Sequence, residues 1–402
     1  MARGGMLAAA LVALGVSGGT AMAQEQVEKR VFEAGAYQTR GGGTIANARI
    51  GYQTMGRLNA AGDNAVLIAH FFSGNSHAFG RLGGANGPVG YWDAIIGPGK
   101  PIDTDRFFVV SSDTLVNVNV GDPNTTTTGP ATINPETGRP YGMTFPVVSM
   151  RDFVEVQKKL LDSLGVKRLA LVAGPSNGGL QAIEWAAAYP EMVERVMPVI
   201  AAEFDAWMQG WLDIWEAPIR LDPNWREGDY YGAGREPPLR GLAEAWKIVT
   251  LQANDRTWTR QFDRRIPEGQ DPAKRIGDRF EVERVLDAAG QARARTSDAN
   301  SFLYMVRANQ LALREYPSLE AALSRSQARW LMVPTTQSRS AWRGEKRGAS
   351  APKRAMSKRG DAMAMNSIPQ QAVTKGYWNS EYFFAQLRRS SKRVVAKPAS
   401  EP

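Results

Sequence analysis

Residues 166–190 have the sequence VKRLALVAGPSNGGLQAIEWAAAYP. The apolar run Val166–Ala173 favours a buried strand, and Gly178–Ala188 has the apolar content of a helix that stops before Pro190. Between them lies the segment GPSNG, which is a G-x-S-x-G motif at a strand-to-helix junction. This context predicts a sharp turn that presents a serine hydroxyl to solvent.

The turn nominates Ser176 as a nucleophile. Gly174 and Gly178 stand two residues to either side of it, where the absence of a side chain lets strand and helix approach each other. The hydroxyl would then lie near a helix N-terminus, whose free N–H groups favour negative charge. The alternative is an ordinary serine turn without chemistry.

The chain around this motif alternates between strand and helix patterns. Strands are expected at Arg49–Thr54, Ala65–Ala69, Phe107–Ser111 and Val193–Ile200, and a helix at Val154–Leu164. This succession predicts an α/β fold with a mostly parallel central sheet and helices on both faces. From 201 to 319 the pattern changes to Trp-rich helical segments, typical of an inserted cap, and Ala328–Val333 resumes as a strand.

A second loop suits the serine chemistry. The buried strand Ala65–Ala69 runs directly into His70-Phe71-Phe72-Ser73-Gly74. In a fold of this kind that loop donates one N–H of an oxyanion hole, and the residue after the nucleophile donates the other. The backbone amides of Phe72 and Asn177 are therefore the candidates, and His70 is expected to hold the loop as a structural residue.

Composition excludes several classes of site. The 402 residues include two histidines and no cysteine, so disulfides, thiolate nucleophiles and Cys-ligated metals are excluded, and we predict neither a metal site nor a cofactor. Asp103, Asp105 and Asp113 flank a strand and are expected on a loop face rather than in a metal site, because no histidine is nearby. The net charge of +9 is confined to the end of the chain, since residues 337–402 hold 14 basic and four acidic residues while the remainder holds 35 and 36. No motif accompanies this charge, so no nucleic-acid partner is predicted.

The first 23 residues predict export. Arg3 precedes an apolar run from Met6 to Val16, and small residues at Ala21 and Ala23 form a cleavage site for a signal peptide. We expect a periplasmic or secreted protein without stable membrane insertion, because that run is too short to span a bilayer. The predicted organisation is a signal peptide (1–23), a core (24–200), a helical cap (201–319), a return to the core (320–336) and a non-matching basic tail (337–402).

Ordered motifs resemble a known family. The segments GYQTMGRLNA and NAVLIAHFFSGNSH (within 51–77), YWDAIIGPGKPIDTDRFFVVSSD (91–113), TTGPATINPETGRPYGMTFPVV (127–148) and the nucleophile motif resemble homoserine O-acetyltransferases and their esterase-like relatives in the α/β-hydrolase superfamily. The cap stretches LDPNWREGDYY (221–231) and DANSFLY (298–304) are similar too. The resemblance implies the α/β-hydrolase fold, acyl transfer by a Ser–His–Asp triad through an acyl-enzyme at Ser176, and a homodimer formed through the cap.

Departures from the family pattern limit what is carried over. Asn177 replaces the usual Met after the serine, and residues 114–126 replace a glycine-rich segment. Acetyl-CoA is cytoplasmic, whereas an exported enzyme would meet water in excess. The sequence therefore favours an exported hydrolase acting on a small-molecule ester or acyl substrate. The alternatives are a homoserine O-acetyltransferase using acetyl-CoA and a non-catalytic binding protein with a relict pocket.

The tail lacks the rest of the triad. The family's Asp and its Gly-His motif are expected near the C-terminus. No histidine follows His77, and the surroundings of the four acids of the tail do not match the family's Asp segment. Neither a triad acid nor a triad histidine is therefore identified. A shifted reading frame over residues 366–381, NSIPQQAVTKGYWNSE, permits FDSTAGGHQGLLE, which resembles the family's terminal segment. We hypothesise that the tail beyond about Thr336 is an out-of-frame product of a formerly complete gene or a sequencing artefact; the alternative is a solvated basic tail. Activity of the chain as written is expected to be impaired, because serine without a base is a poor nucleophile.

Overall fold

The computed structural model describes residues 25–84, 86–201, 205–254 and 256–333, so the expected signal peptide and basic tail lie outside the described residues. A seven-stranded sheet forms the centre, in the order β13-β12-β11-β4-β8-β3-β2. Its strands are β2 (Arg30–Gln38), β3 (Thr44–Met55), β4 (Ala65–Ala69), β8 (Phe108–Ser112), β11 (Leu169–Pro175), β12 (Arg195–Val199) and β13 (Arg329–Trp330).

The direction of the strands gathers several strand ends at one edge. From β13 to β8 all neighbours are parallel, whereas β3 runs antiparallel to β8 and to β2. Ala173 of β11 pairs with Ile68 of β4, so these two strands end side by side. In open α/β sheets the carboxyl ends of parallel strands are where loops build a site.

The two faces of the sheet bury separate sets of side chains. Along β4, Leu67 faces one apolar cluster and Val66 and Ile68 face the other, as the alternation of a strand requires. The first cluster contains side chains from α1 (Met150–Ser163) and α2 (Asn177–Ala188). The second packs against segment 78–102, which includes η1 (Asp93–Ile95). This two-sided burial explains why β4 is a continuous apolar run.

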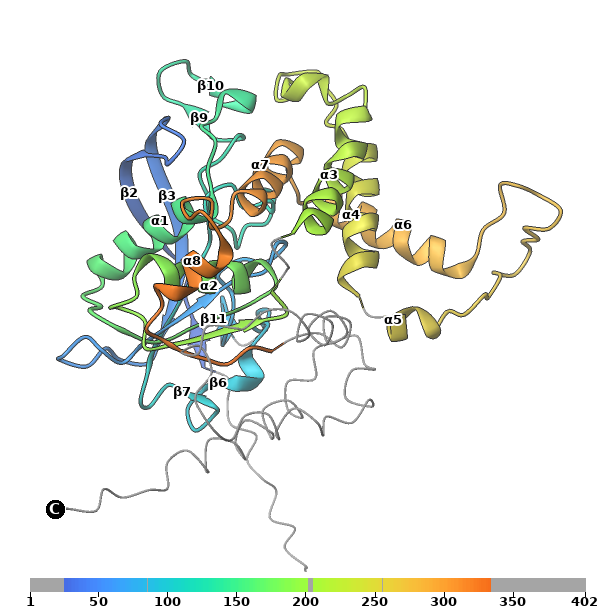
Figure 1. Cartoon of the computed structure of the whole chain (residues 1–402). Coiled ribbons are helices and arrows are strands. Elements are labelled where there is room, and N and C mark those ends of the chain that lie inside the picture. Colours follow the sequence, from blue (N-terminus) through green and yellow to red (C-terminus); the bar gives the residue numbers. More distant parts are fainter. Residues whose placement is uncertain (1–24, 85, 202–204, 255, 334–402) are drawn as a thin grey trace, which may run out of the picture.

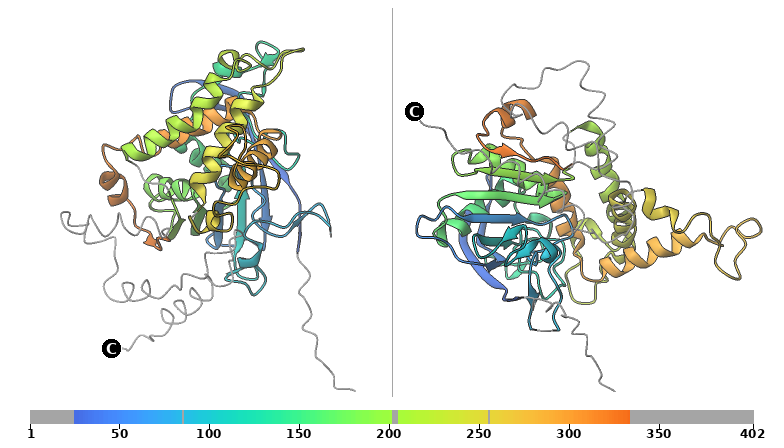
Figure 2. Two further views of the ribbon diagram at one scale, coloured as in Figure 1. Left: turned by 90° about the vertical axis from the view of Figure 1, so that its right-hand side faces the viewer. Right: turned by 90° about the horizontal axis from the view of Figure 1, so that it is seen from below.

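The helices of the expected cap follow β12. They are α3 (Ala206–Leu221), α4 (Leu239–Ala253), α5 (Arg256–Arg260), α6 (Glu281–Ala294) and α7 (Ala299–Gln310), with η3 (Arg226–Gly228) after α3; α8 (Leu319–Ser324) then precedes β13. Figures 1 and 2 show α3 and α4 standing beside the sheet, while α5 and α6 project away from it. The cap contacts run from α7 to α3, from α3 to α4 and from α4 to α6, while α8 packs on α2.

The two cap motifs found in the sequence meet at the start of α7. Asp298 caps that helix, and its carboxylate also accepts hydrogen bonds from the Tyr230 hydroxyl at 2.5 Å and the Tyr231 hydroxyl at 2.9 Å. The indole of Trp225 donates to Asn300 Oδ1 at 2.9 Å. These contacts fasten the loop after α3 to α7.

The remaining elements are short. They are β1 (Gln26–Val27), β5 (Arg81–Leu82), β6 (Ile96–Gly97), β7 (Ile102–Asp103), β9 (Ile133–Asn134), β10 (Arg139–Pro140) and η2 (Gly142–Thr144). No helix among the described residues is long and apolar enough to cross a bilayer.

The strand expected at Ala328–Val333 is shorter in the structure. It pairs with β12 only over Arg329–Trp330, with one further β-bridge between Val199 and Val333.

Candidate active site

Ser176 occupies the turn between β11 and α2, as the sequence predicts. Its backbone has φ 53° and ψ −118°, a strained conformation for a residue with a side chain. The turn is held because Ser176 N donates to Val199 O at 2.8 Å and Gly179 N donates to Ser176 O at 2.8 Å. The side chain is partly exposed, and no described residue forms a hydrogen bond with its hydroxyl.

Gly174 and Gly178 are required by close packing rather than by a positive φ. A Cβ on Gly174 would lie 2.5 Å from Ala69 O, and one on Gly178 would lie 2.2 Å from the same oxygen. Real Cβ atoms do not approach backbone oxygen this closely. The two glycines thus let the end of β11 and the first turn of α2 pack directly on the end of β4.

The two candidate oxyanion donors lack hydrogen-bond partners among the described residues. Neither the backbone N–H of Phe72 nor that of Asn177 donates to any residue that the structure describes. Asn177 begins α2, where N–H groups lack partners within the helix. Phe72 lies in a turn closed by a 2.8 Å hydrogen bond from Gly74 N to Phe71 O. Both amides follow strands that end side by side, which is the placement that an oxyanion hole requires.

Phe72 also joins the site to the cap. Its ring makes edge-to-face contacts with Trp215 of α3, Trp246 of α4 and Phe302 of α7, with centroids 5.1–5.8 Å apart. Such aromatic pairs add stability beyond the apolar area that they bury. The cap helices therefore help to set the position of the loop of residues 70–77, which is called the oxyanion loop below because it carries the candidate donor Phe72.

His70 is a structural residue in this loop. Its ring is fully buried, with Nδ1 2.7 Å from Phe71 O, and Nε2 3.3 Å from Thr114 Oγ1 and 3.4 Å from Asn117 Nδ2. A carbonyl only accepts, so Nδ1 carries the proton and Nε2 accepts from its neighbours. Burial lowers the pKa of His70, which keeps the ring neutral.

His77 does not serve the serine either. Its Nε2 lies 2.9 Å from Pro88 O and its Nδ1 lies 3.2 Å from Gln53 Oε1, and burial lowers its pKa. Both histidines of the chain are thus engaged away from Ser176. No triad histidine or acid is found beside Ser176 among the described residues.

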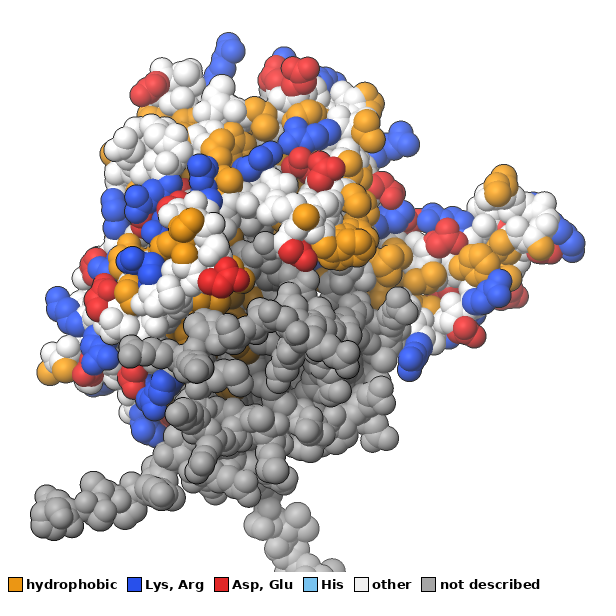
Figure 3. Space-filling view, in the orientation of Figure 1, with side chains coloured by type: hydrophobic (Ala, Val, Ile, Leu, Met, Phe, Trp, Pro, Cys, Tyr) orange, Lys and Arg blue, Asp and Glu red, His pale blue; other side chains and the backbone are white. Residues whose placement is uncertain are grey.

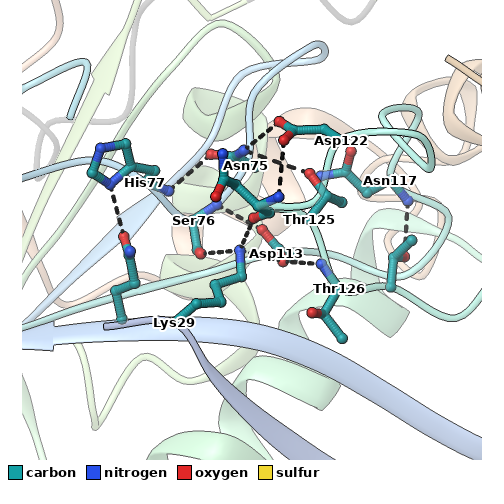
Figure 4. Close-up of polar contacts among 12 residues, drawn as sticks. Lys29, Asn75, Ser76, His77, Asp113, Asn117, Asp122, Thr125 and Thr126 are labelled. Atoms are coloured by element: carbon teal, nitrogen blue, oxygen red, sulfur yellow. Dashed lines mark hydrogen bonds and ion pairs between the residues drawn. The ribbon is translucent and has the colours of Figure 1, made fainter. Parts of the chain in front are cut away.

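The oxyanion loop is anchored to the segment after β8 (Figure 4). Asp113 accepts hydrogen bonds from Ser76 N at 2.6 Å and Thr126 N at 2.7 Å and forms a 2.7 Å ion pair with Lys29. The Asn117 side chain donates to Gly74 O at 2.9 Å. Asp113 lies in the loop that follows β8, and its carboxylate is completely buried. The sequence carried no signal for its partner Lys29, which lies on a distant segment.

Two surface hollows lie away from Ser176 and the two candidate oxyanion residues. One surface hollow lies between α4 and α6 around Lys247 and Asp287, and another lies beside β1 around Gln26 and Thr54. Neither is lined by Ser176 or the two oxyanion residues. Within the described ranges, no group of three or more His, Asp and Glu side chains could hold a metal ion.

The mostly parallel sheet and the strained serine at the turn between β11 and α2 are the features of an α/β-hydrolase fold. A family profile described as "alpha/beta hydrolase fold" matches residues 100–294. Among curated proteins, the chain is 40% identical to a homoserine O-acetyltransferase of Moorella thermoacetica, over 67% of this chain and 70% of the relative. It is 38% identical to the Methanococcoides burtonii homoserine O-acetyltransferase over 75% of this chain, but spans only 61% of that relative.

Solved structures agree with this placement. The chain is similar to esterase E22, with 46% identity, a TM-score of 0.72 and coverage of 77% of this chain and 84% of the other. It is also similar to homoserine O-acetyltransferase from Bacillus anthracis, with 35% identity, a TM-score of 0.74 and coverage of 82% and 90%. The chain belongs to the homoserine O-acetyltransferase-like branch of the α/β-hydrolase superfamily, which is a family of enzymes.

Proposed function

We propose that this protein transfers acyl groups through an acyl-enzyme at Ser176. The observation that carries the proposal is the strained serine, which has no hydrogen bond to a described residue, together with two backbone N–H groups that lack described partners, that of Asn177 directly after it and that of Phe72 in the loop after β4. Ser176 Oγ would attack an acyl carbonyl, and the two amides would donate to the oxygen as it becomes negative. Collapse of this tetrahedral adduct expels the thiol or alcohol of the substrate and leaves the acyl group on Ser176. An alcohol or water then takes the acyl group from the serine.

O-acetyl transfer to homoserine is the best supported reaction. Curated relatives at 37–40% identity are named homoserine O-acetyltransferase, and a solved acetyltransferase superposes on most of the chain. These relatives favour the acetyltransferase over the ester hydrolase that the signal peptide suggested. Ester hydrolysis remains a second candidate, because the similarity to esterase E22 is higher in sequence identity. Both reactions use the same small-molecule acyl chemistry at Ser176.

We further propose that turnover of this chain is limited by a missing general base. The sequence holds two histidines, and the ring nitrogens of both have other partners. The serine proton then has no imidazole to receive it. Loss of a triad histidine lowers kcat by a factor on the order of 10⁶. A restored reading frame over residues 366–381 would supply a Gly-His pair.

Export and dimerisation are separate proposals. β1 begins at Gln26, so cleavage after Ala23 would remove no described element. N-terminal sequencing of the periplasmic fraction tests this, and recovery of an uncleaved cytoplasmic chain would refute it. For dimerisation, α3 exposes Trp207, Ile214 and Leu221 at seven-residue intervals, a spacing that suits a partner helix. Hydrophobic side chains are visible on the surface in the region of α3 and α4 (Figure 3). Light scattering should give a dimer that Trp207→Glu weakens, and a monomeric parent chain would refute it.

One experiment separates the candidate reactions. The purified chain is given acetyl-CoA with and without homoserine, and separately p-nitrophenyl acetate, and release of thiol or phenolate is followed. Homoserine-dependent thiol release that is lost in Ser176→Ala supports the acetyltransferase. Phenolate release alone supports the esterase, and substrate binding without either release supports the non-catalytic alternative.

A further inference from the structure

A line of four carboxamide side chains crosses the molecule next to Ser176. The Trp185 indole donates to Gln157 Oε1 at 2.8 Å, and Gln157 Nε2 donates to Gln181 Oε1 at 2.8 Å. Gln181 Nε2 donates to Asn177 Oδ1 at 2.8 Å. The line continues as Asn177 Nδ2 donates to Asn309 Oδ1 at 3.0 Å, and Asn309 Nδ2 donates to Met305 O at 2.7 Å. It therefore joins α1, α2 and α7 (Figure 1).

The two ends of the line determine its direction. An indole N–H can only donate, and a backbone carbonyl can only accept. Every carboxamide in the line must then point its oxygen toward the Trp185 end and its nitrogen toward the Met305 end. Gln157 and Gln181 are completely buried and Asn177 nearly so, so reversal of one amide would leave unpaired polar atoms away from water.

Gln181 has a second contact that the line itself does not need. Its Nε2 also lies 3.3 Å from the backbone oxygen of His70, two residues before Phe72. One hydrogen of this amide thus goes to the residue that follows the nucleophile, and the other goes to the loop after β4. We infer that Gln181 is a positioning residue that holds the two arms of the oxyanion hole, at Phe72 and at Asn177, in fixed relation.

This inference rests on the proposed acyl transfer. The bond from Asn177 to Asn309 ties the turn from Gly174 to Gly178, called the elbow below, to α7. Removal of an entire oxyanion donor typically lowers turnover by roughly 10²–10³. Loss of one positioning side chain displaces the donors without removing them, so a smaller loss of roughly 10- to 100-fold is expected.

The test compares two matched substitutions, Gln181→Met and Gln157→Met. Each removes one buried carboxamide from the same line and keeps a similar volume, but only Gln181 touches the oxyanion arms. The rate of Ser176-dependent acylation by p-nitrophenyl acetate should fall roughly 10- to 100-fold in Gln181→Met, with KM nearly unchanged, and less than about threefold in Gln157→Met. Equal losses in the two variants, or none in Gln181→Met, would overturn the inference.

A second readout does not depend on catalysis. Hydrogen exchange at the Gly74 amide, whose bond to Phe71 O closes the turn that carries Phe72, should speed up in Gln181→Met and not in Gln157→Met. If the parent chain shows no Ser176-dependent acylation, the proposed function fails and this exchange alone decides the role of Gln181. Unchanged exchange at Gly74 in Gln181→Met would then refute it.

Discussion

The buried ion pair beneath the oxyanion loop gives the sharpest prediction on stability. Lys29 Nζ lies 2.7 Å from Asp113 Oδ2 and 2.6 Å from Ser76 Oγ, and it also contacts Asn124 O (Figure 4). The Asp113 side chain is fully buried and that of Lys29 is only 14% exposed. Lys29→Met removes the cation and leaves the carboxylate buried with two backbone N–H donors alone.

The expected cost follows from that burial. Breaking a buried pair by removal of one partner typically destabilises by about 3–5 kcal/mol, because the remaining charge is uncompensated. We expect this loss in the free energy of unfolding, measured by urea denaturation. Lys158→Met is the control, since Lys158 pairs with Asp162 on the surface and such pairs contribute about 0–1 kcal/mol.

A double variant distinguishes loss of the pair from loss of lysine packing. Lys29→Met combined with Asp113→Asn should cost less than the sum of the single changes, by roughly 1–3 kcal/mol, because neither charge is then left alone. The reasoning is refuted if Lys29→Met costs no more than Lys158→Met, or if the two changes at the pair are additive.

Two further outcomes concern the elbow and the buried imidazole. Gly178→Ala would place a Cβ 2.2 Å from Ala69 O, so it should destabilise the protein by about 1–3 kcal/mol and slow acylation. The control is Gly210→Ala on α3, where a Cβ meets open space and should stabilise the helix by about 0.5–1 kcal/mol. Equal effects of the two variants on thermal unfolding would contradict this. Burial lowers the pKa of His70, so below about pH 6.5 the unfolded chain binds a proton that the folded chain does not, and the free energy of unfolding should fall by up to about 1.4 kcal/mol per pH unit as the pH drops. His70→Gln should remove this part of the slope between about pH 7 and pH 5, and parallel curves for the two proteins would show that His70 titrates normally.

Local patterns predicted the parts of the fold that are buried on both sides. The apolar run Ala65–Ala69 coincides with β4, and the helix expected at Gly178–Ala188 is α2 with one more residue at its start. β2 was not predicted, because it is an edge strand whose residues are mostly exposed and lack a clean alternation. The elbow was predictable because its glycines and serine are adjacent in sequence.

Contacts between distant segments could not be predicted in this way. Lys29 and Asp113 are far apart in sequence, and nothing in the residues around either of them indicates a buried ion pair. The bond between Asn177 and Asn309 likewise depends on where the cap places α7. Alternation and turn signals carry no information about such partners, which the packing of whole elements selects.

The most direct test of acyl transfer at Ser176 is a mass measurement of the acyl-enzyme. The parent chain, Ser176→Ala and a chain with the frame restored over residues 366–381 are each exposed to p-nitrophenyl acetate, and acetylation of the peptide that contains Ser176 is followed with time. We predict slow acetylation of Ser176 in the parent chain, none in Ser176→Ala, and a rate at least on the order of 10³ faster in the restored chain. Equal labelling of the parent and Ser176→Ala would contradict the assignment of the nucleophile, and equal rates in the parent and restored chains would contradict the missing base.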